Sequence, residues 1–245
     1  MCPRAYDYPN LDLHMTGEIV DEIIRQTQDY TNYICIAGRG EPLLCKNILD
    51  IIETIVVHKK RFYMHTNGDF IHKYIDDLDS LLNLTYTDEG NKPKILLNCY
   101  DGIDQWKQFT ELYGHFKGIN ITYDRRDDDK DYVDNKFKIG QYVNRGGTVP
   151  WTTTDNLQKP CYILWNKAYF NWNGDLQLCC HDWKYIKTFG NIMTDTFDEM
   201  WHKNIHSYRM GLLEYGGRQN FIECEKCDSV QEHENSFKLY QQWCH

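Results

Sequence analysis

Hydrophobic residues in the first half of the chain follow two alternating patterns. Stretches with apolar residues three and four positions apart predict helices over residues 16–30, 44–58, 69–82 and 103–116. Short apolar runs between them predict buried strands over residues 33–37, 61–66, 94–99 and 119–123. Repeated strand–helix units favour an α/β fold with a parallel sheet and right-handed crossovers. In a barrel-like sheet the chemistry lies on the loops at the carboxyl ends of the strands.

A different pattern begins after residue 160, where a β-hairpin is predicted around Asn173-Gly174. Both residues tolerate positive φ, so the pair favours a two-residue turn between strands 168–172 and 175–180. Side chains alternate between the two faces of a strand. On that pattern Cys180 packs in the core and Cys179 faces the other way, unless a bulge exchanges them. A helix over residues 196–208 follows the hairpin.

Four cysteines frame this hairpin. Cys161 and Cys179 are separated by 17 residues, and Cys224 and Cys227 by two. Thiolates drawn from three places on the chain suit a buried metal centre. Zinc sites typically combine two short C-x2-4-C turns, and here only Cys224 and Cys227 form one. A [4Fe-4S] cluster is wider and accepts ligands from distant loops, so iron–sulfur is favoured over zinc.

Composition narrows the class of protein. The chain has 245 residues, 18 Tyr and 7 Trp, which excludes a disordered chain and suits one large domain with a small appendage. The net charge of −9 argues against a general nucleic-acid surface. No apolar run approaches the roughly 20 residues of a membrane span, and the first residues form no signal peptide. The ten cysteines are therefore expected to be reduced, in a cytoplasmic protein.

The cysteine spacing also resembles a known domain. C-x12-G-x4-C, a long gap and C-x2-C are similar to the twitch domain, the short form of the SPASM domain. The segments 190–192 and 197–201 resemble its further G-N-I and F-x-E-x-W motifs. In radical S-adenosylmethionine (SAM) enzymes this domain follows the barrel and holds an auxiliary [4Fe-4S] cluster. The resemblance implies that Cys161, Cys179, Cys224 and Cys227 are its ligands. With the junction in the polar segment 151–159, the domains are residues 1–150 and 151–245.

Three strand ends resemble loops of the same family, and the resemblance implies SAM binding for two of them. By itself Gly38-Arg39-Gly40-Glu41-Pro42 is a tight strand-to-helix turn. The family carries a similar G-E-P loop that binds the SAM ammonium, which implies a cofactor-binding role for Gly40 and Glu41. Thr66-Asn67-Gly68 resembles the T-N-G that ends the next strand. Asn98 stands where the family often has a serine that contacts the SAM ribose, and it keeps the hydrogen-bonding capacity.

The first residues, Met1-Cys2-Pro3-Arg4, resemble the end of the C-x3-C-x2-C motif that binds the SAM-reducing cluster. Cys2 would be its third cysteine, and the other two would lie before residue 1 in a longer chain. The alternative is a short form that has lost SAM cleavage; the intact G-E-P loop favours the longer chain. We therefore expect a partial (β/α)6 TIM-like barrel lacking its first strand, followed by a small domain of β-hairpin and helix. One cysteine cannot hold a [4Fe-4S] cluster well. The chain as written should therefore hold the auxiliary cluster better than the SAM-reducing cluster.

The resemblance implies a radical SAM iron–sulfur enzyme. Such enzymes reduce SAM, form a 5′-deoxyadenosyl radical and abstract hydrogen from a small-molecule or peptide substrate. A reductant such as flavodoxin or ferredoxin would supply the electron. Arg145, in an N-R-G-G segment similar to one before the twitch domain, is a candidate catalytic residue, with a surface turn as the alternative. The competing hypothesis is a non-catalytic interaction protein in which an iron–sulfur cluster or a zinc ion has a purely structural role.

Overall fold

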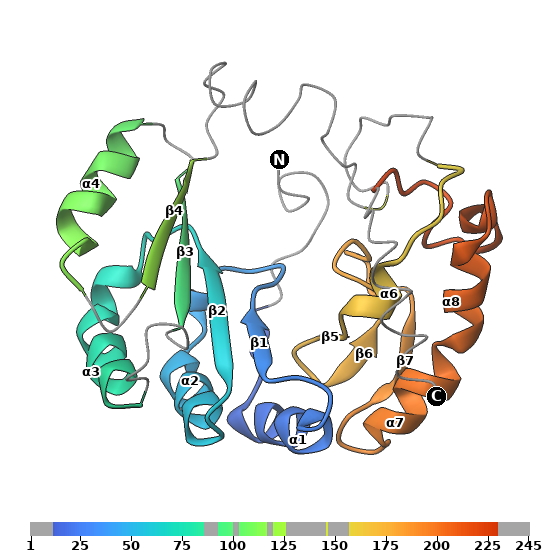
Figure 1. Ribbon diagram of the computed structural model, residues 1–245, viewed down its shortest axis with the longest axis horizontal. Coiled ribbons are helices and arrows are strands. Elements are labelled where there is room, and N and C mark those ends of the chain that lie inside the picture. Colours follow the sequence, from blue (N-terminus) through green and yellow to red (C-terminus); the bar gives the residue numbers. More distant parts are fainter. Residues whose placement is uncertain are drawn as a thin grey trace. The chain divides into compact units, whose positions relative to one another are not determined.

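The computed structural model describes residues 12–85, 93–99, 103–116, 120–125, 146 and 157–229 (Figure 1). The chain divides into two compact units. One is Thr16–Ile139, and the other is Gly140–His245 together with Met1–Met15.

The unit Thr16–Ile139 contains a sheet of four parallel strands in the order in which they occur along the chain. They are β1 (Tyr33–Ile36), β2 (Arg61–Thr66), β3 (Lys94–Cys99) and β4 (Asn120–Arg125). The predicted α/β class with a parallel sheet is confirmed. All four strands end at the same edge, so the loops that follow them lie near one another.

Helices connect these strands as the hydrophobic spacing predicts. They are α1 (Gly17–Thr27), α2 (Ile48–Val57), α3 (Ile75–Thr85) and α4 (Ile103–Tyr113), with 3₁₀ turns at Pro42–Leu44 and Ile71–Lys73. Figure 1 shows α3 and α4 on the same side of β3 and β4. None of the helices in the described ranges is long and apolar enough to cross a membrane.

The core of this unit forms from one face of each helix and the alternating residues of the strands. The side chains that α2 buries are those predicted, namely Ile48, Ile51, Ile52, Ile55 and Val56. In β2 every second residue is buried, including Phe62 and Met64. Burial of such side chains contributes roughly 1.5–3 kcal/mol each and fixes the sheet against its helices.

One core prediction was wrong. The first strand was expected to be buried, but the residues of β1 are exposed or half-buried, and Cys35 is exposed. In the described sheet β1 pairs along one edge only, with β2. Helix α1 buries Val20 and Ile24 with Thr27, whereas Ile19 and Ile23 are half-buried.

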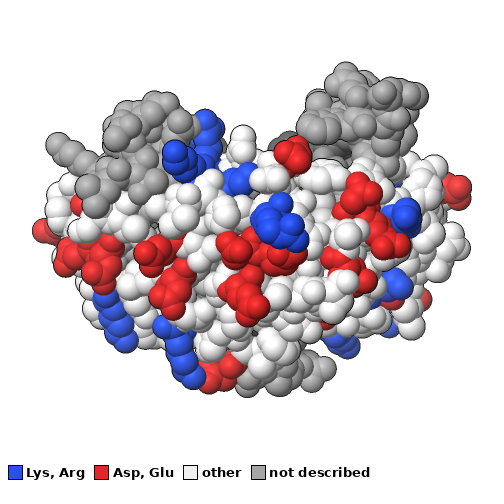
Figure 2. Space-filling view, turned by 90° about the horizontal axis from the view of Figure 1, so that it is seen from below, with Lys and Arg blue, Asp and Glu red and all other residues white. Residues whose placement is uncertain are grey.

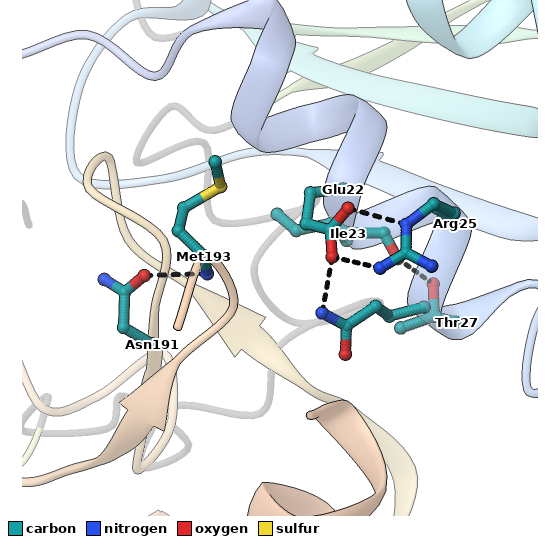
Figure 3. Close-up of polar contacts among 7 residues, drawn as sticks. Glu22, Ile23, Arg25, Thr27, Asn191 and Met193 are labelled. Carbon is teal, nitrogen blue, oxygen red and sulfur yellow. Dashed lines mark hydrogen bonds and ion pairs between the residues drawn. The ribbon is translucent and has the colours of Figure 1, made fainter. Parts of the chain in front are cut away.

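Polar contacts fix both ends of α1. The Thr16 hydroxyl oxygen accepts from the Ile19 backbone N–H at 3.4 Å, as an N-cap does. Figure 3 shows the last turn, where Glu22 accepts from the Arg25 guanidinium at 2.5 and 2.7 Å. The Thr27 hydroxyl donates to the Ile23 carbonyl oxygen at 2.7 Å. The Thr16 cap marks the start of the helix, and the other bonds stabilise its C-terminal half.

The other unit contains the predicted hairpin. The antiparallel strands are β5 (Tyr169–Phe170), β6 (Asp175–Gln177) and β7 (Thr188–Asn191), after the short helix α6 (Ile163–Asn166). The turn is longer than the two residues expected, because pairing stops at Phe170 opposite Leu176. Its last residue, Gly174, has φ of 88°, which favours glycine. Figure 3 also shows the loop after β7, where Asn191 Oδ1 accepts from the Met193 backbone N–H at 2.9 Å.

The predicted helix 196–208 is interrupted. It comprises α7 (Phe197–Glu199), a π turn (Met200–Asn204) and α8 (His206–Leu213), and a 3₁₀ turn follows at Gly217–Asn220. The π turn that interrupts the helix contacts Arg209, a wholly buried residue of α8.

Arg209 lies between the rings of Trp165 and Trp201, with its guanidinium carbon 5.2 and 4.0 Å from their centroids. Its Nη1 donates to the Trp201 carbonyl oxygen inside the π turn, and its Nε donates to the Leu164 carbonyl oxygen at 2.9 Å. A buried guanidinium thus ties the π turn to α6.

Candidate metal centre and cofactor-binding loops

The structure brings the four predicted metal ligands to one cavity. Cys161, Cys179, Cys224 and Cys227 all line it, and its volume is about 20 Å³, measured as the space open to the centre of a water molecule. Cys161 lies two residues before α6, Cys179 follows β6, and the remaining pair lies in the turns after Gly217–Asn220. The rest of the wall contains the apolar residues Ile163, Leu164, Leu178 and Leu212 and the polar residues His181, Arg218, Glu223 and Ser229.

Backbone hydrogen bonds hold these cysteines in place. The Cys161 N–H donates to the Leu212 carbonyl oxygen at 2.8 Å, which ties the first cysteine to the end of α8. The Cys224 N–H donates to the Phe221 carbonyl oxygen, and the Cys227 N–H to the Cys224 carbonyl oxygen, both at 2.9 Å. The C-x-x-C turn is therefore built by its own backbone.

The thiols sit in an environment that resists ionisation. Burial raises the pKa of all four cysteines, because a thiolate is poorly solvated there. The charges of neighbouring cysteines raise the pKa of Cys179 further, well above its usual range. Deprotonating four such thiols together requires a compensating positive charge, and a bound metal cluster supplies one.

Cys179, rather than Cys180, lies on the cavity wall, as the hairpin analysis favoured. The prediction that Cys180 packs in the core was wrong, because Cys180 is half-buried. Strand β6 ends at Gln177, and its pairing with β7 shifts register between Asp175 and Gln177. The alternation therefore stops before residue 178, and consecutive residues Leu178 and Cys179 both line the cavity.

The donor set decides what the cavity can hold. Within the described ranges, no three His, Cys, Asp or Glu side chains meet closely enough to ligate one metal ion. The four thiols instead share the wall of one largely apolar cavity. All-thiolate ligation from separate loops is the donor chemistry of a [4Fe-4S] cluster, so the residues present fit that group.

Two hydrogen-bonded residues extend this site. The backbone N–H of His181 donates to the Cys179 sulfur at 3.3 Å, and the His181 ring contacts the Ser229 hydroxyl at 3.1 Å. Arg218 also lines the cavity. Our sequence reasoning missed Arg218, because a single arginine has no local pattern that signals burial.

The G-E-P loop is anchored through the Glu41 carboxylate. That carboxylate accepts from the Thr66 hydroxyl at 2.5 Å and from the backbone N–H groups of Leu43 and Asn67 at 3.0 Å each. The Glu41 carboxylate thus joins the loops that follow β1 and β2. Its predicted role in SAM binding stays a prediction.

Asn98, at the end of β3, belongs to the same set of loops. Its amide nitrogen donates to the Thr66 carbonyl oxygen at 3.3 Å. Its Oδ1 is buried and has no hydrogen-bond partner in the part of the chain that is described. A buried acceptor of this kind fits a ligand hydroxyl group. Gly40 is exposed in the loop after β1, whereas Cys2 and Arg145 lie outside the described residues.

Comparison with known proteins agrees with this geometry. Residues 161–228 match the SPASM family, described as an iron–sulfur cluster-binding domain. A curated relative is the S-adenosyl-L-methionine-dependent 2-deoxy-scyllo-inosamine dehydrogenase of Niallia circulans. It is 26% identical over 230 residues, which cover 88% of this chain and 82% of the relative.

Two crystal structures of BtrN share the fold. The complex of BtrN with AdoMet and 2-DOIA has a TM-score of 0.70 and 23% identity, and covers 94% of this chain and 86% of BtrN. The open conformation has a TM-score of 0.61 and 20% identity, and covers 91% and 85%. The four cysteines of the cavity lie within the matched SPASM residues. The chain therefore carries a SPASM-type iron–sulfur domain over residues 161–228 and, over most of its length, is similar to an S-adenosyl-L-methionine-dependent dehydrogenase.

Proposed function

We propose that this protein is a radical SAM enzyme that dehydrogenates an alcohol group of a small polyhydroxylated substrate, with an auxiliary [4Fe-4S] cluster held by Cys161, Cys179, Cys224 and Cys227. The observation that carries the proposal is the position of these four thiols on the wall of one cavity. The substrate class rests on the relative that dehydrogenates 2-deoxy-scyllo-inosamine. A peptide substrate is the alternative that the domain type allows.

The chain's own residues have distinct tasks in this proposal. When bound, the SAM-associated cluster supplies reducing power for hydrogen abstraction, and the auxiliary cluster supplies a one-electron acceptor. The apolar wall of Ile163, Leu164, Leu178 and Leu212 excludes water from the auxiliary site. The His181 N–H donates to the Cys179 sulfur, which stabilises the thiolate form.

In the first unit we propose that the loops after β1, β2 and β3 bind SAM. Glu41 positions the Gly40 backbone through its bonds to Thr66 and Asn67. Asn98 Oδ1 accepts a hydrogen bond from a ligand hydroxyl, which would satisfy an otherwise unpartnered buried acceptor. Cys2 is a proposed ligand of the SAM cluster.

The remaining assignments extend this proposal. The parallel sheet belongs to a partial (β/α)6 barrel, with residues 1–150 as the SAM domain and 151–245 as the auxiliary domain. Arg145 contacts the substrate. The location is cytoplasmic, where thiol ligands stay reduced.

A small reductant such as flavodoxin or ferredoxin, rather than nucleic acid, is the proposed macromolecular partner. Figure 2 shows Asp and Glu side chains spread over one face of the molecule, with Lys and Arg scattered among them. This distribution agrees with the net charge of −9 and would repel a phosphate backbone.

The test is anaerobic reconstitution with iron and sulfide, followed by iron and sulfide analysis and electron paramagnetic resonance. We expect a reducible [4Fe-4S] signal that depends on the four cysteines. 5′-Deoxyadenosine should form when SAM and dithionite are added to a chain that carries the complete C-x3-C-x2-C motif. A colourless protein loaded with zinc would contradict the cluster assignment. A fully loaded protein that forms no 5′-deoxyadenosine would contradict the proposed reaction.

A further inference from the structure

We propose that Arg218 is the buried counter-charge of the auxiliary cluster, and that it sets the reduction potential of the cluster while joining two of the segments that hold it. This inference rests on the cluster site proposed above. It concerns a positioning residue, because Arg218 would act through the cysteines and the cluster.

The first observation is the position of Arg218. It is 1% exposed and lines the same cavity as the four cysteines. It follows α8 in the turn Gly217–Asn220, six residues before Cys224. Burial raises the pKa of Cys161, Cys224 and Cys227, and the positive charge of Arg218 partly opposes that rise. One guanidinium thus acts electrostatically on three of the four proposed ligands.

The second observation is what Arg218 bonds to. Its Nε donates to the Lys159 carbonyl oxygen at 2.8 Å and its Nη1 to the Cys227 carbonyl oxygen at 2.7 Å. Its Nη2 donates to the carbonyl oxygens of Pro160 at 3.4 Å and Ser229 at 2.6 Å. All four acceptors are neutral main-chain groups. They satisfy the donors of the guanidinium without neutralising its charge.

A wholly buried cation is costly unless an opposite charge lies nearby. Four thiolates around a [4Fe-4S] core with two positive charges leave a net charge of about −2, which the cavity would place beside Arg218. The two costs offset each other when the cluster is bound, beyond what the Glu223 carboxylate on the same cavity wall provides. A positive charge at this site also stabilises the reduced cluster more than the oxidised one, because the reduced cluster carries one more negative charge.

The bonds of Arg218 have a second effect, on geometry. Lys159 and Pro160 directly precede Cys161, and Ser229 follows Cys227 by two residues. The planar fork of arginine reaches both segments at once, which the single ammonium of lysine does not match. Arg218 therefore holds the segments that carry two of the ligands at a fixed separation.

Arg209 provides a matched control for a merely structural role. It is also wholly buried in the same unit and also donates to main-chain carbonyl oxygens, those of Leu164 and Trp201. It packs between two tryptophan rings and is not among the residues that line the cavity. Replacing Arg209 should destabilise the unit without changing the electrostatic environment of the cluster.

The experiment compares wild type, Arg218→Gln, Arg218→Lys, Arg209→Gln and Arg209→Lys after anaerobic reconstitution. Each protein is assayed for iron content and for the midpoint potential of the auxiliary cluster by redox titration, and its cluster is challenged with a chelator. In Arg218→Gln we expect the equilibrium constant for one-electron reduction to fall at least tenfold, a shift of about 59 mV to more negative potential. Arg218→Lys should keep a potential near that of wild type but lose iron to the chelator faster. The Arg209 variants should leave the potential unchanged.

Equal potentials in fully loaded Arg218→Gln and wild type would overturn the inference. If Arg218→Gln does not fold, the test becomes a comparison of Arg218→Lys with Arg209→Lys, in which the rate of iron loss to the chelator is measured. Iron loss faster than in an equally destabilised Arg209→Lys supports the inference, and equal loss overturns it. Failure of wild type itself to bind an iron–sulfur cluster would overturn the proposed function first, and the inference with it.

Discussion

The Glu41 carboxylate and the Thr66 hydroxyl lie 2.5 Å apart and join the loops that follow β1 and β2. The two residues are 25 positions apart in the sequence. The same carboxylate receives two backbone N–H groups, so it is an internal anchor of the G-E-P loop. The loop's shape therefore depends on a residue outside the loop.

Thr66→Val should loosen this loop. The substitution keeps the side-chain shape but removes the hydroxyl that donates to Glu41 and accepts from the Gly68 N–H at 3.1 Å. Losing a part-buried hydrogen bond to a carboxylate costs about 1.5–3 kcal/mol, measurable by urea unfolding. We expect SAM affinity, measured by calorimetry, to fall about tenfold or more. The control is Thr54→Val, whose hydroxyl donates within α2, to the Asp50 carbonyl oxygen. SAM affinity equal to wild type would show that the anchor does not shape the SAM site.

The two adjacent cysteines should behave differently. Cys179 lines the cavity and is buried, whereas Cys180 is half-buried and absent from the wall. Cys179→Ser should therefore lose the auxiliary cluster, and Cys180→Ser should retain it, as measured by iron and sulfide content and the visible spectrum. The reverse pattern would mean that the backbone after β6 turns the other way when the cluster binds.

Gly68→Ala should destabilise the first unit. Gly68 has φ of 83°, and an added Cβ would lie 2.7 Å from the Phe109 ring. A non-glycine residue in this region costs about 1–3 kcal/mol, before any clash. Gly38→Ala is the matched control, because an added Cβ there meets nothing within 4 Å. Urea unfolding should show a clear loss of stability for Gly68→Ala and a change below about 0.5 kcal/mol for Gly38→Ala.

Acid should remove a small stabilising effect at Glu22. Hydrogen bonds from Arg25 and Gln26 lower the pKa of Glu22 from its ordinary value of 4.5 to about 2. The contribution is therefore fully present above pH 4.5 and is lost as the pH falls towards 2. The Arg25 side chain is 64% exposed, so solvent screening limits the effect to below about 1 kcal/mol. The difference in unfolding free energy between wild type and Glu22→Gln should shrink over this range. A difference independent of pH would contradict the assignment.

Local periodicity was enough to predict the sheet and its helices. The isoleucines of α2 recur at helical spacing and are all buried, and strands β2 and β3 lie where their apolar runs predict. The hairpin followed from Asn173-Gly174, because turn chemistry is also local. Each of these features depends on residues within a few positions of one another.

The features that local patterns missed depend on distant contacts. Arg218 bonds to Lys159 across 59 positions, and Arg209 bonds to Leu164 across 45. Neither pairing leaves a periodic signal. The π turn beside Arg209 and the register shift in β6 break the regular periods from which the helix and the strand were predicted.

The cavity walls are assembled from segments that begin at Cys161 and end at Ser229. A nascent chain therefore exposes its first two candidate ligands long before Cys224 and Cys227 emerge from the ribosome. Cluster assembly factors would meet the complete set of four ligands only after Cys227 has been synthesised. The yield of loaded protein in cells should therefore depend on how long the incomplete site escapes oxidation.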